Sequence, residues 1–247
     1  MLCSKLLLVK NAMTLSRRII AEVLGTAFLL AAVVGSGIMG ERLAGGNTAI
    51  ALLANTLATG ATLATLIFVF GPISGGHFNP AVTLASASQG GISRSDVPGY
   101  IAGQMFGAFI GVGVAHLMFE EALIQVSQHA RSGGGQLFSE FIATFGLLCV
   151  ILGCVRLRSE AVPIAVGLYI TGAYWFTAST SFANPAVTLA RAFTNTFSGI
   201  RPVDAPGFIV AQLLGAFTAT FLFCWLVPLN PSEAKAVVLS NSAARPE

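Results

Sequence analysis

A seven-residue string occurs twice in the chain, as Asn79 to Ala85 and again as Asn184 to Ala190. Both copies read Asn-Pro-Ala-Val-Thr-Leu-Ala. Asn accepts hydrogen bonds from the free backbone N–H groups of a first helical turn, and Pro suits that turn because its missing N–H would have no partner there. Each copy therefore predicts the start of a short helix, and the duplication predicts a chain built from two related halves.

Both copies interrupt strongly hydrophobic sequence. Hydrophobic residues make up 55% of the 247 residues and charged residues only 9%, with a mean hydropathy of +0.80, which indicates an integral membrane protein. Broken helices are tolerated at membrane depth where they line a polar cavity. The two strings therefore predict a pore, with the motif residues Asn79, Pro80, Ala81, Asn184, Pro185 and Ala186 at its centre.

The hydrophobic pattern predicts an all-α membrane protein with six transmembrane helices and two re-entrant half-helices. We expect spans at residues 19–39, 48–70, 97–119, 136–155, 162–180 and 205–227, each close to the length that crosses a bilayer. The expected organisation is an N-terminal tail (1–18), a first repeat (19–119), a connecting loop (120–135), a second repeat (136–228) and a C-terminal tail (229–247).

The repeat extends beyond the two strings, because residues 96–109 match residues 204–217 at eight of fourteen positions. Three spans in each half is an odd number, so the second half must be inverted relative to the first. Basic residues then divide nine to four between the two sides, which predicts that both termini lie in the cytoplasm. The expected location is the cell (inner) membrane. One side carries Lys5, Lys10, Arg17, Arg18, Arg94, Arg156, Arg158, Lys235 and Arg245, and the other carries Arg42, Arg131, Arg191 and Arg201.

Inversion brings the N-termini of the two half-helices together near the midplane. Each N-terminus carries about half a positive charge from its aligned peptide dipoles, so the pair repels cations. Asn79 and Asn184 can cap backbone groups and still direct an N–H donor into the lumen. Water molecules in single file must then turn their oxygens toward the centre, which interrupts proton transfer.

Other classes of function find little support in the sequence. The net charge of +3 is small and the basic residues are scattered, so no nucleic-acid partner is expected. The four cysteines lack metal-ligand spacing, and there is no nucleophile–base pair or His-Glu-x-x-His string. We therefore expect no enzyme activity, no metal and no cofactor. A junctional or structural membrane protein stays open as the alternative of another class.

The paired motifs resemble those of the major intrinsic protein family, the aquaporins and aquaglyceroporins. The string Ser74-Gly75-Gly76-His77-Phe78-Asn79-Pro80-Ala81-Val82 is very close to the first signature of that family, and Ala21-Glu22 with Gly25-Thr26 resembles its usual opening. The resemblance implies a homotetramer in the lipid bilayer. Each subunit would pass small neutral solutes such as water, glycerol and urea.

One departure from the family pattern concerns the constriction. Most members carry Arg directly after the second Asn-Pro-Ala, whereas this chain has Val187. Counting back from the motifs places the other constriction residues at Thr59, Gly172 and Ser181, a small and uncharged set that predicts a wide filter. A valine at this position resembles the bacterial arsenic-resistance channels of the family, which implies passage of arsenous acid and methylated arsenicals. A water or glycerol channel without an arsenic role stays open.

The remaining expectations concern single residues. We expect Glu22 and Glu140 to be buried structural acids that accept N–H bonds from the loops behind the pore. Arg191 lies one turn after Val187 and either restores positive potential at the outer mouth or is an ordinary charge at the membrane interface. The expected pore-lining loop residues are Gly75, Gly76, His77, Thr180 and Phe182, with His77 packed and hydrogen-bonded rather than acting as a pH gate.

Overall fold

The computed structural model describes residues 13–228, and the two expected tails therefore fall largely outside the described residues. Between residues 13 and 228 every regular element is helical, and no strand occurs. The helices are α2 (Leu15–Leu43), α3 (Thr48–Ser74), α4 (Pro80–Ser88), α5 (Val97–Met118), α6 (Gly134–Leu157), α7 (Val162–Phe176), α8 (Pro185–Arg191) and α9 (Ala205–Leu226), with a short 3₁₀ turn, η1 (Ser159–Ala161). The all-α prediction is confirmed.

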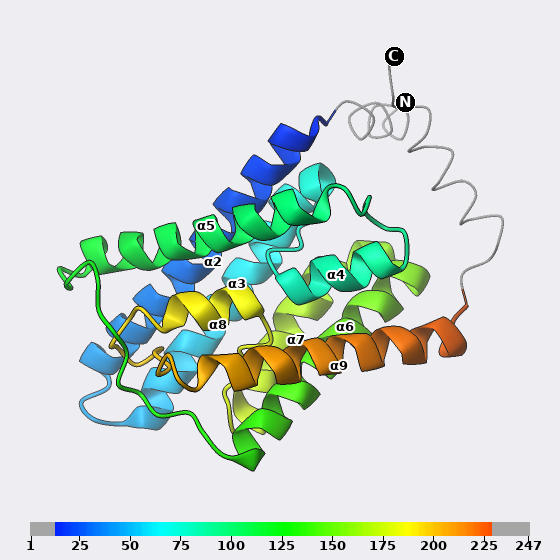
Figure 1. The fold of residues 1–247 in the computed structure, drawn as a ribbon. Coiled ribbons are helices and arrows are strands. Elements are labelled where there is room, and N and C mark those ends of the chain that lie inside the picture. Colours follow the sequence, from blue (N-terminus) through cyan, green and yellow to red (C-terminus); the bar gives the residue numbers. More distant parts are fainter. Residues whose placement is uncertain (1–12, 229–247) are drawn as a thin grey trace.

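The helices pack as two equivalent sets. In the first half α2 lies against α3 and α5, and in the second half α6 lies against α7 and α9. Contacts between α3 and α7 join the halves, and the half-helices α4 and α8 touch each other between α5 and α9 (Figure 1). The architecture therefore has six spans and two half-helices, as an inverted repeat requires.

Glycines allow the helices of each half to pack backbone to backbone. A Cβ placed on Gly107 of α5 would lie 2.3 Å from the carbonyl oxygen of Val23 in α2. The equivalent Cβ on Gly215 of α9 would lie 2.4 Å from the carbonyl oxygen of Phe141 in α6. Only glycine permits such approaches, which are typical of helix packing in membranes.

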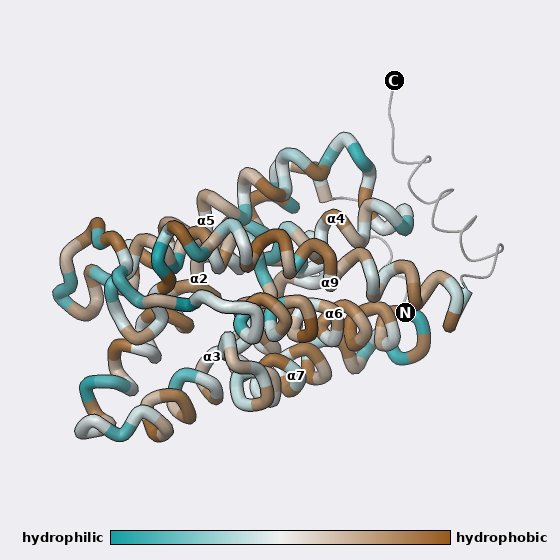
Figure 2. The backbone as a smooth tube through the Cα atoms, turned by 60° about the horizontal axis from the view of Figure 1, so that its bottom comes forward, coloured by the Kyte–Doolittle hydropathy of each residue, from teal (hydrophilic) through white to brown (hydrophobic). Residues whose placement is uncertain are grey.

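Five helices are long and apolar enough to cross a membrane among the described residues, namely α2, α3, α5, α6 and α9. The fifth span in sequence, α7, has only 15 residues, so the prediction of a helical span over 162–180 was wrong at its end. The helix stops at Phe176 because Thr177 takes an extended backbone and begins the loop to α8. Hydrophobic colour follows the helices in Figure 2, and hydrophilic colour gathers in the connecting segments.

Candidate pore

The two motif asparagines cap the half-helices, as the sequence predicts. The Oδ1 atom of Asn79 accepts a hydrogen bond from the backbone N–H of Ala81 at 2.9 Å, and Oδ1 of Asn184 accepts one from Ala186 at 3.0 Å. Both asparagines adopt extended backbone before a Pro at the first helical position. The cap geometry is therefore fixed by the local sequence Asn-Pro-Ala.

Each asparagine also bonds to the opposite half. The Nδ2 atom of Asn79 donates to the carbonyl of Ala183 at 2.7 Å, and Nδ2 of Asn184 donates to the carbonyl of Phe78 at 2.8 Å. Phe78 and Ala183 both have a φ of 48°, an uncommon value for residues other than glycine, which turns their carbonyls toward the partner loop. One N–H of each amide is used in this way. The second N–H of each amide remains for the lumen, which both asparagines line.

The other motif residues lie behind the asparagines. Pro80, Ala81, Pro185 and Ala186 are buried and are not among the residues that line the cavity. They occupy the starts of α4 and α8, which contact each other. Among the six motif positions, therefore, only the two asparagines face the lumen, while the prolines and alanines set the position of the half-helices.

Glu22 fastens the first re-entrant loop to α2. The carboxylate is fully buried, and its two oxygens accept bonds from the backbone N–H of His77 at 3.0 Å and of Phe78 at 2.7 Å. The Ser74 hydroxyl and the Gln104 amide also donate to it. These are the contacts expected of a structural acid.

Glu140 does the same for the second loop. Its oxygens accept from the backbone N–H of Phe182 at 2.8 Å, from that of Ala183 at 2.9 Å, and from Nε2 of Gln212 at 2.6 Å. Gln212 also donates to Thr188 in α8, just as Gln104 donates to Thr83 in α4. The inverted repeat is therefore reproduced at the level of single hydrogen bonds.

A cavity of about 380 Å³ runs between the two halves. At one end it is lined by Gln89 and Arg156, close to the end of α4. At the other end it is lined by Tyr174, Ser181, Val187 and Arg191, close to the end of α8, and we call this end the α8 mouth. One wall is apolar and comes from α6 and α7, with Leu147, Leu148, Ile151, Leu152, Val166 and Ile170.

Three of the four expected constriction residues line this cavity, namely Thr59, Ser181 and Val187. The placement of Gly172 was wrong. Gly172 is exposed on α7, and a Cβ built on it would meet nothing within 4 Å. Tyr174 lines the cavity instead, is 3% exposed, and holds its hydroxyl 3.5 Å from Oγ1 of Thr59. Counting back from the motif across the loop gave the wrong helical register for α7. The α8 mouth therefore has an uncharged side chain at Val187, but its side chains are not all small, because Tyr174 is among them.

Four of the five expected loop residues line the cavity, namely Gly75, Gly76, His77 and Phe182. Thr180 does not, because its Oγ1 faces Arg131 of the connecting loop at 3.4 Å. His77 is held through Nδ1, 3.1 Å from Oγ1 of Thr83. The histidine is thus packed and hydrogen-bonded, as expected.

Arg191 is buried at the α8 mouth and is not an exposed interfacial charge. Its side chain is 2% exposed, and its guanidinium carbon lies 3.4 Å from the centroid of the Phe182 ring. Its Nε atom donates to the carbonyl of Ser198. Its Nη1 atom and the Oγ atom of Ser181 have no hydrogen-bond partner among residues 13–228, and both residues line the cavity. Both polar groups are therefore buried beside the cavity without a partner from the described part of the chain.

The structure has two opposed, capped half-helices within an inverted six-span repeat. They enclose a cavity with polar groups along one side, and this arrangement defines a multi-pass membrane channel. The sequence profile of the Major intrinsic protein family matches residues 9–171 and 155–245, and the chain belongs to this family. It is 56% identical to Aquaglyceroporin AqpS of Rhizobium meliloti (strain 1021) over 218 residues, which cover 88% of this chain and 93% of that protein.

More distant relatives agree with this assignment. Nodulin-26 of Glycine max is 32% identical over 237 residues, covering 92% of this chain and 86% of that protein. The X-ray structure of the aquaglyceroporin from Plasmodium falciparum shares the fold with a TM-score of 0.71 at 22% identity, covering 90% of this chain and all of that one. The chain is an aquaglyceroporin-type channel for small solutes and not an enzyme.

Proposed function

We propose that the channel passes arsenous acid together with glycerol, urea and water, and that it also admits methylated trivalent arsenicals. The observation that carries this proposal is Val187, an uncharged residue at the α8 mouth where the family resemblance leads one to expect a guanidinium. Arsenous acid is a small neutral trihydroxy solute. A mouth without a fixed charge at this position leaves space for such a solute beside the apolar wall.

The polar groups of the α8 mouth suit a solute with several hydroxyls. Thr59, Tyr174 and Ser181 each carry a hydroxyl that can both donate and accept, and Nη1 of Arg191 lies buried beside the cavity without a partner from residues 13–228. These groups can replace part of the hydration of a trihydroxy solute as it enters. Tyr174 fills more space than Gly172, the residue expected at this place from the sequence. We therefore propose that the α8 mouth is of intermediate width and not as wide as the sequence predicted.

The experiment is a parallel stopped-flow measurement of water, glycerol, urea and arsenous acid flux in proteoliposomes. We expect all four to exceed the flux of protein-free vesicles. Flux of water and glycerol without arsenous acid would favour the alternative, a channel with no arsenic role. No added flux of any solute would favour the structural alternative, a junctional membrane protein.

We further propose an inner-membrane location with both termini in the cytoplasm and the loop 120–135 outside. The nine-to-four division of basic residues supports this orientation. Protease added to spheroplasts, in which the outer face of the inner membrane is accessible, is expected to leave an epitope tag on the C-terminus uncut. Cleavage of the tag in intact spheroplasts would reverse the assignment, and cleavage after the spheroplasts are permeabilised serves as the control.

The oligomer proposed from the family resemblance is a homotetramer of independently conducting subunits. Large apolar side chains are exposed along the outer faces of α2, α3, α5, α6, α7 and α9, as a surface shared between lipid and neighbouring subunits requires. Each chain already encloses its own cavity, so the tetramer adds contacts without completing the pore.

A further inference from the structure

Arg131 of the connecting loop reaches the same aromatic ring as Arg191. Its guanidinium carbon lies 5.0 Å from the centroid of Phe182, whose ring also contacts Arg191. Arg131 itself is not among the residues that line the cavity, and its side chain is partly buried. Phe182 therefore couples a loop arginine to the arginine at the α8 mouth.

Three consecutive backbone carbonyls in the segment after α8 accept hydrogen bonds from the two arginines. The outer two accept from Arg131 and the middle one accepts from Arg191. Nε of Arg131 donates to Gly199 at 2.8 Å, and its Nη2 donates to Phe197 at 3.4 Å. The carbonyl between them, that of Ser198, accepts from Nε of Arg191. The backbone segment 197–199 thus holds both side chains, and neither guanidinium can shift without disturbing the acceptors of the other.

The connecting loop that carries Arg131 is fastened along the segment after α8. Backbone bonds join Ser127 to Ala192 at 3.0 Å and Arg201 to His129 at 2.8 Å. The backbone N–H of Arg131 donates to Asp204 at 2.9 Å. Burial raises the pKa of Asp204, but hydrogen bonds from Arg201 and from this N–H outweigh burial and lower it overall, which keeps the carboxylate charged as an acceptor.

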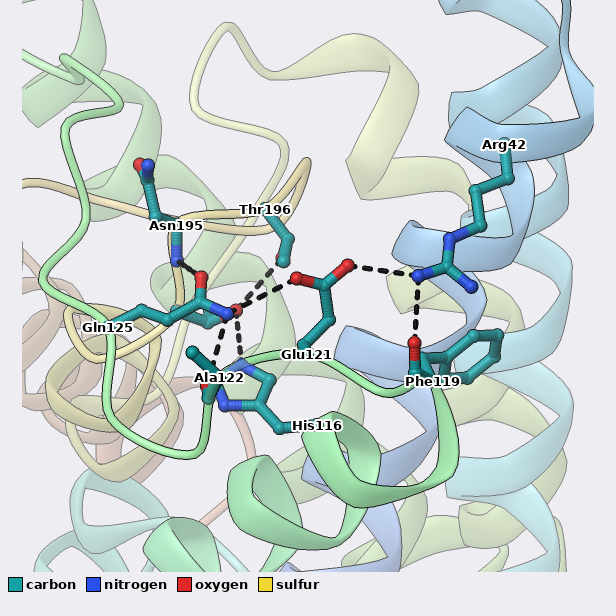
Figure 3. A network of polar contacts seen from close by, with 9 residues as sticks. Arg42, His116, Phe119, Glu121, Ala122, Gln125, Asn195 and Thr196 are labelled. Carbon is teal, nitrogen blue, oxygen red and sulfur yellow. Dashed lines mark hydrogen bonds and ion pairs between the residues drawn. The ribbon is translucent and has the colours of Figure 1, made fainter.

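A second polar network fixes the start of the same loop (Figure 3). Arg42 bonds to Glu121 at 3.0 Å, and Gln125 bonds to Glu121 at 3.3 Å. Gln125 also accepts from the backbone N–H of Asn195 at 3.0 Å. The loop is therefore held at both ends, and the placement of Arg131 is a built feature of the fold.

We propose that Arg131 is a positioning residue for the selectivity of the α8 mouth. It holds Phe182 and the carbonyls of residues 197–199, and it thereby keeps the Arg191 guanidinium against the Phe182 ring beside the cavity, one helical turn beyond Val187. Cations are thereby rejected at the mouth without narrowing the passage at Val187. This inference rests on the proposed function of the cavity as a solute pathway.

The local charges agree with a cation barrier. Two guanidiniums and one carboxylate, that of Glu140, have Phe182 as a common neighbour. Positive charge therefore exceeds negative charge around the ring. Because the two guanidiniums are buried, salt screens their charge only weakly. A fixed charge a few ångströms from the solute pathway changes the occupancy of the pathway by cations on the order of tenfold.

The test uses the full-length channel in proteoliposomes and measures potassium flux relative to glycerol flux in the same vesicles. Because both fluxes scale with the amount of folded channel, their ratio is independent of how much channel each preparation contains. The variants are Arg131→Gln, Arg131→Lys, Arg191→Gln and the double variant Arg131→Gln/Arg191→Gln. The control is Arg94→Gln, which removes a positive charge at an exposed side chain that does not line the cavity and makes no contact with the connecting loop in the described residues.

We expect Arg191→Gln to raise the potassium-to-glycerol ratio about tenfold and Arg131→Gln to raise it by a similar factor. Arg131→Lys should also raise the ratio, because Lys keeps the charge but lacks the planar guanidinium that bonds the three carbonyls of Ser179, Phe197 and Gly199. The double variant should match Arg191→Gln alone, since Arg131 acts through Arg191. Arg94→Gln should stay at the parent ratio.

Two results would overturn the proposal. One is a parent-like ratio in Arg131→Gln, and the other is a parent-like ratio in Arg131→Lys, which would show that charge alone matters. Failure of the proposed function is distinguishable from both outcomes, because glycerol flux would then be absent in the parent channel itself.

Discussion

Val187→Arg is expected to reduce the flux of glycerol, urea and arsenous acid by at least about tenfold, with a smaller reduction in water flux. The new guanidinium would enter the α8 mouth among Thr59, Tyr174 and Ser181. It carries five fixed donors and a permanent charge, and it would occupy the space that a trihydroxy solute needs. Tyr174 already fills part of this space, so the pore narrows further than a set of small residues would allow. Stopped-flow flux in proteoliposomes gives both rates.

Val187→Thr is the matched control for this prediction, because it keeps the β-branched shape without a charge. We expect the ratio of glycerol to water flux in Val187→Thr to stay close to that of the parent. If glycerol, urea and arsenous acid cross the Val187→Arg channel as fast as the parent, with water also unchanged, then Val187 does not lie at the constriction.

Glu140→Leu is expected to destabilise the folded channel by at least about 3 kcal/mol, because each buried donor left without a partner costs about 1–3 kcal/mol. The substitution removes the acceptor for the backbone N–H of Phe182, the N–H of Ala183 and Nε2 of Gln212. The second re-entrant loop would lose its attachment to α6. We expect a lower yield of folded protein and a lower thermal midpoint in mild detergent.

Glu160→Gln is the control for Glu140→Leu, since Glu160 is an exposed acid in η1, just after the C-terminal end of α6. A surface change of this kind usually alters stability by no more than about 0.5 kcal/mol. Equal thermal midpoints for Glu140→Leu and Glu160→Gln would show that Glu140 does not hold the loop.

Most of the fold followed from local patterns in the sequence. The caps at Asn79 and Asn184 depend only on the residues next to them, so the starts of α4 and α8 could be predicted to the residue. The buried positions of Glu22 and Glu140 followed from the high cost of an acid inside a membrane span, which requires nearby donors.

The errors arose where a position depends on the path of a nonhelical segment. Gly172 and Tyr174 lie two residues apart on α7, and which of them faces the cavity depends on where α7 ends and how the loop returns to α8. Hydrophobic periodicity carries no such information, because α7 is apolar on all sides. Thr180 was misplaced for the same reason, since the backbone of the loop turns its hydroxyl toward Arg131.

Arg131 could not be assigned from the sequence at all. It lies in the connecting loop, more than forty residues before the loop that it contacts, and neither a motif nor a helical spacing marks it. Its role emerges only from the carbonyls of 197–199 and the ring of Phe182. In the same way, the sequence placed Arg191 on the correct face of α8, but its burial against Phe182 required the structure.

The most direct test of the central claim is the reflection coefficient of glycerol, measured by stopped-flow light scattering on proteoliposomes of the parent channel. The claim is that water and small polyhydroxy solutes share one passage through an α8 mouth that Val187 leaves uncharged at its narrow point. A shared passage predicts a reflection coefficient well below unity, with glycerol and water flux rising together as more protein is reconstituted. A coefficient equal to unity, with water flux alone rising, would contradict the claim and define a pore that excludes glycerol.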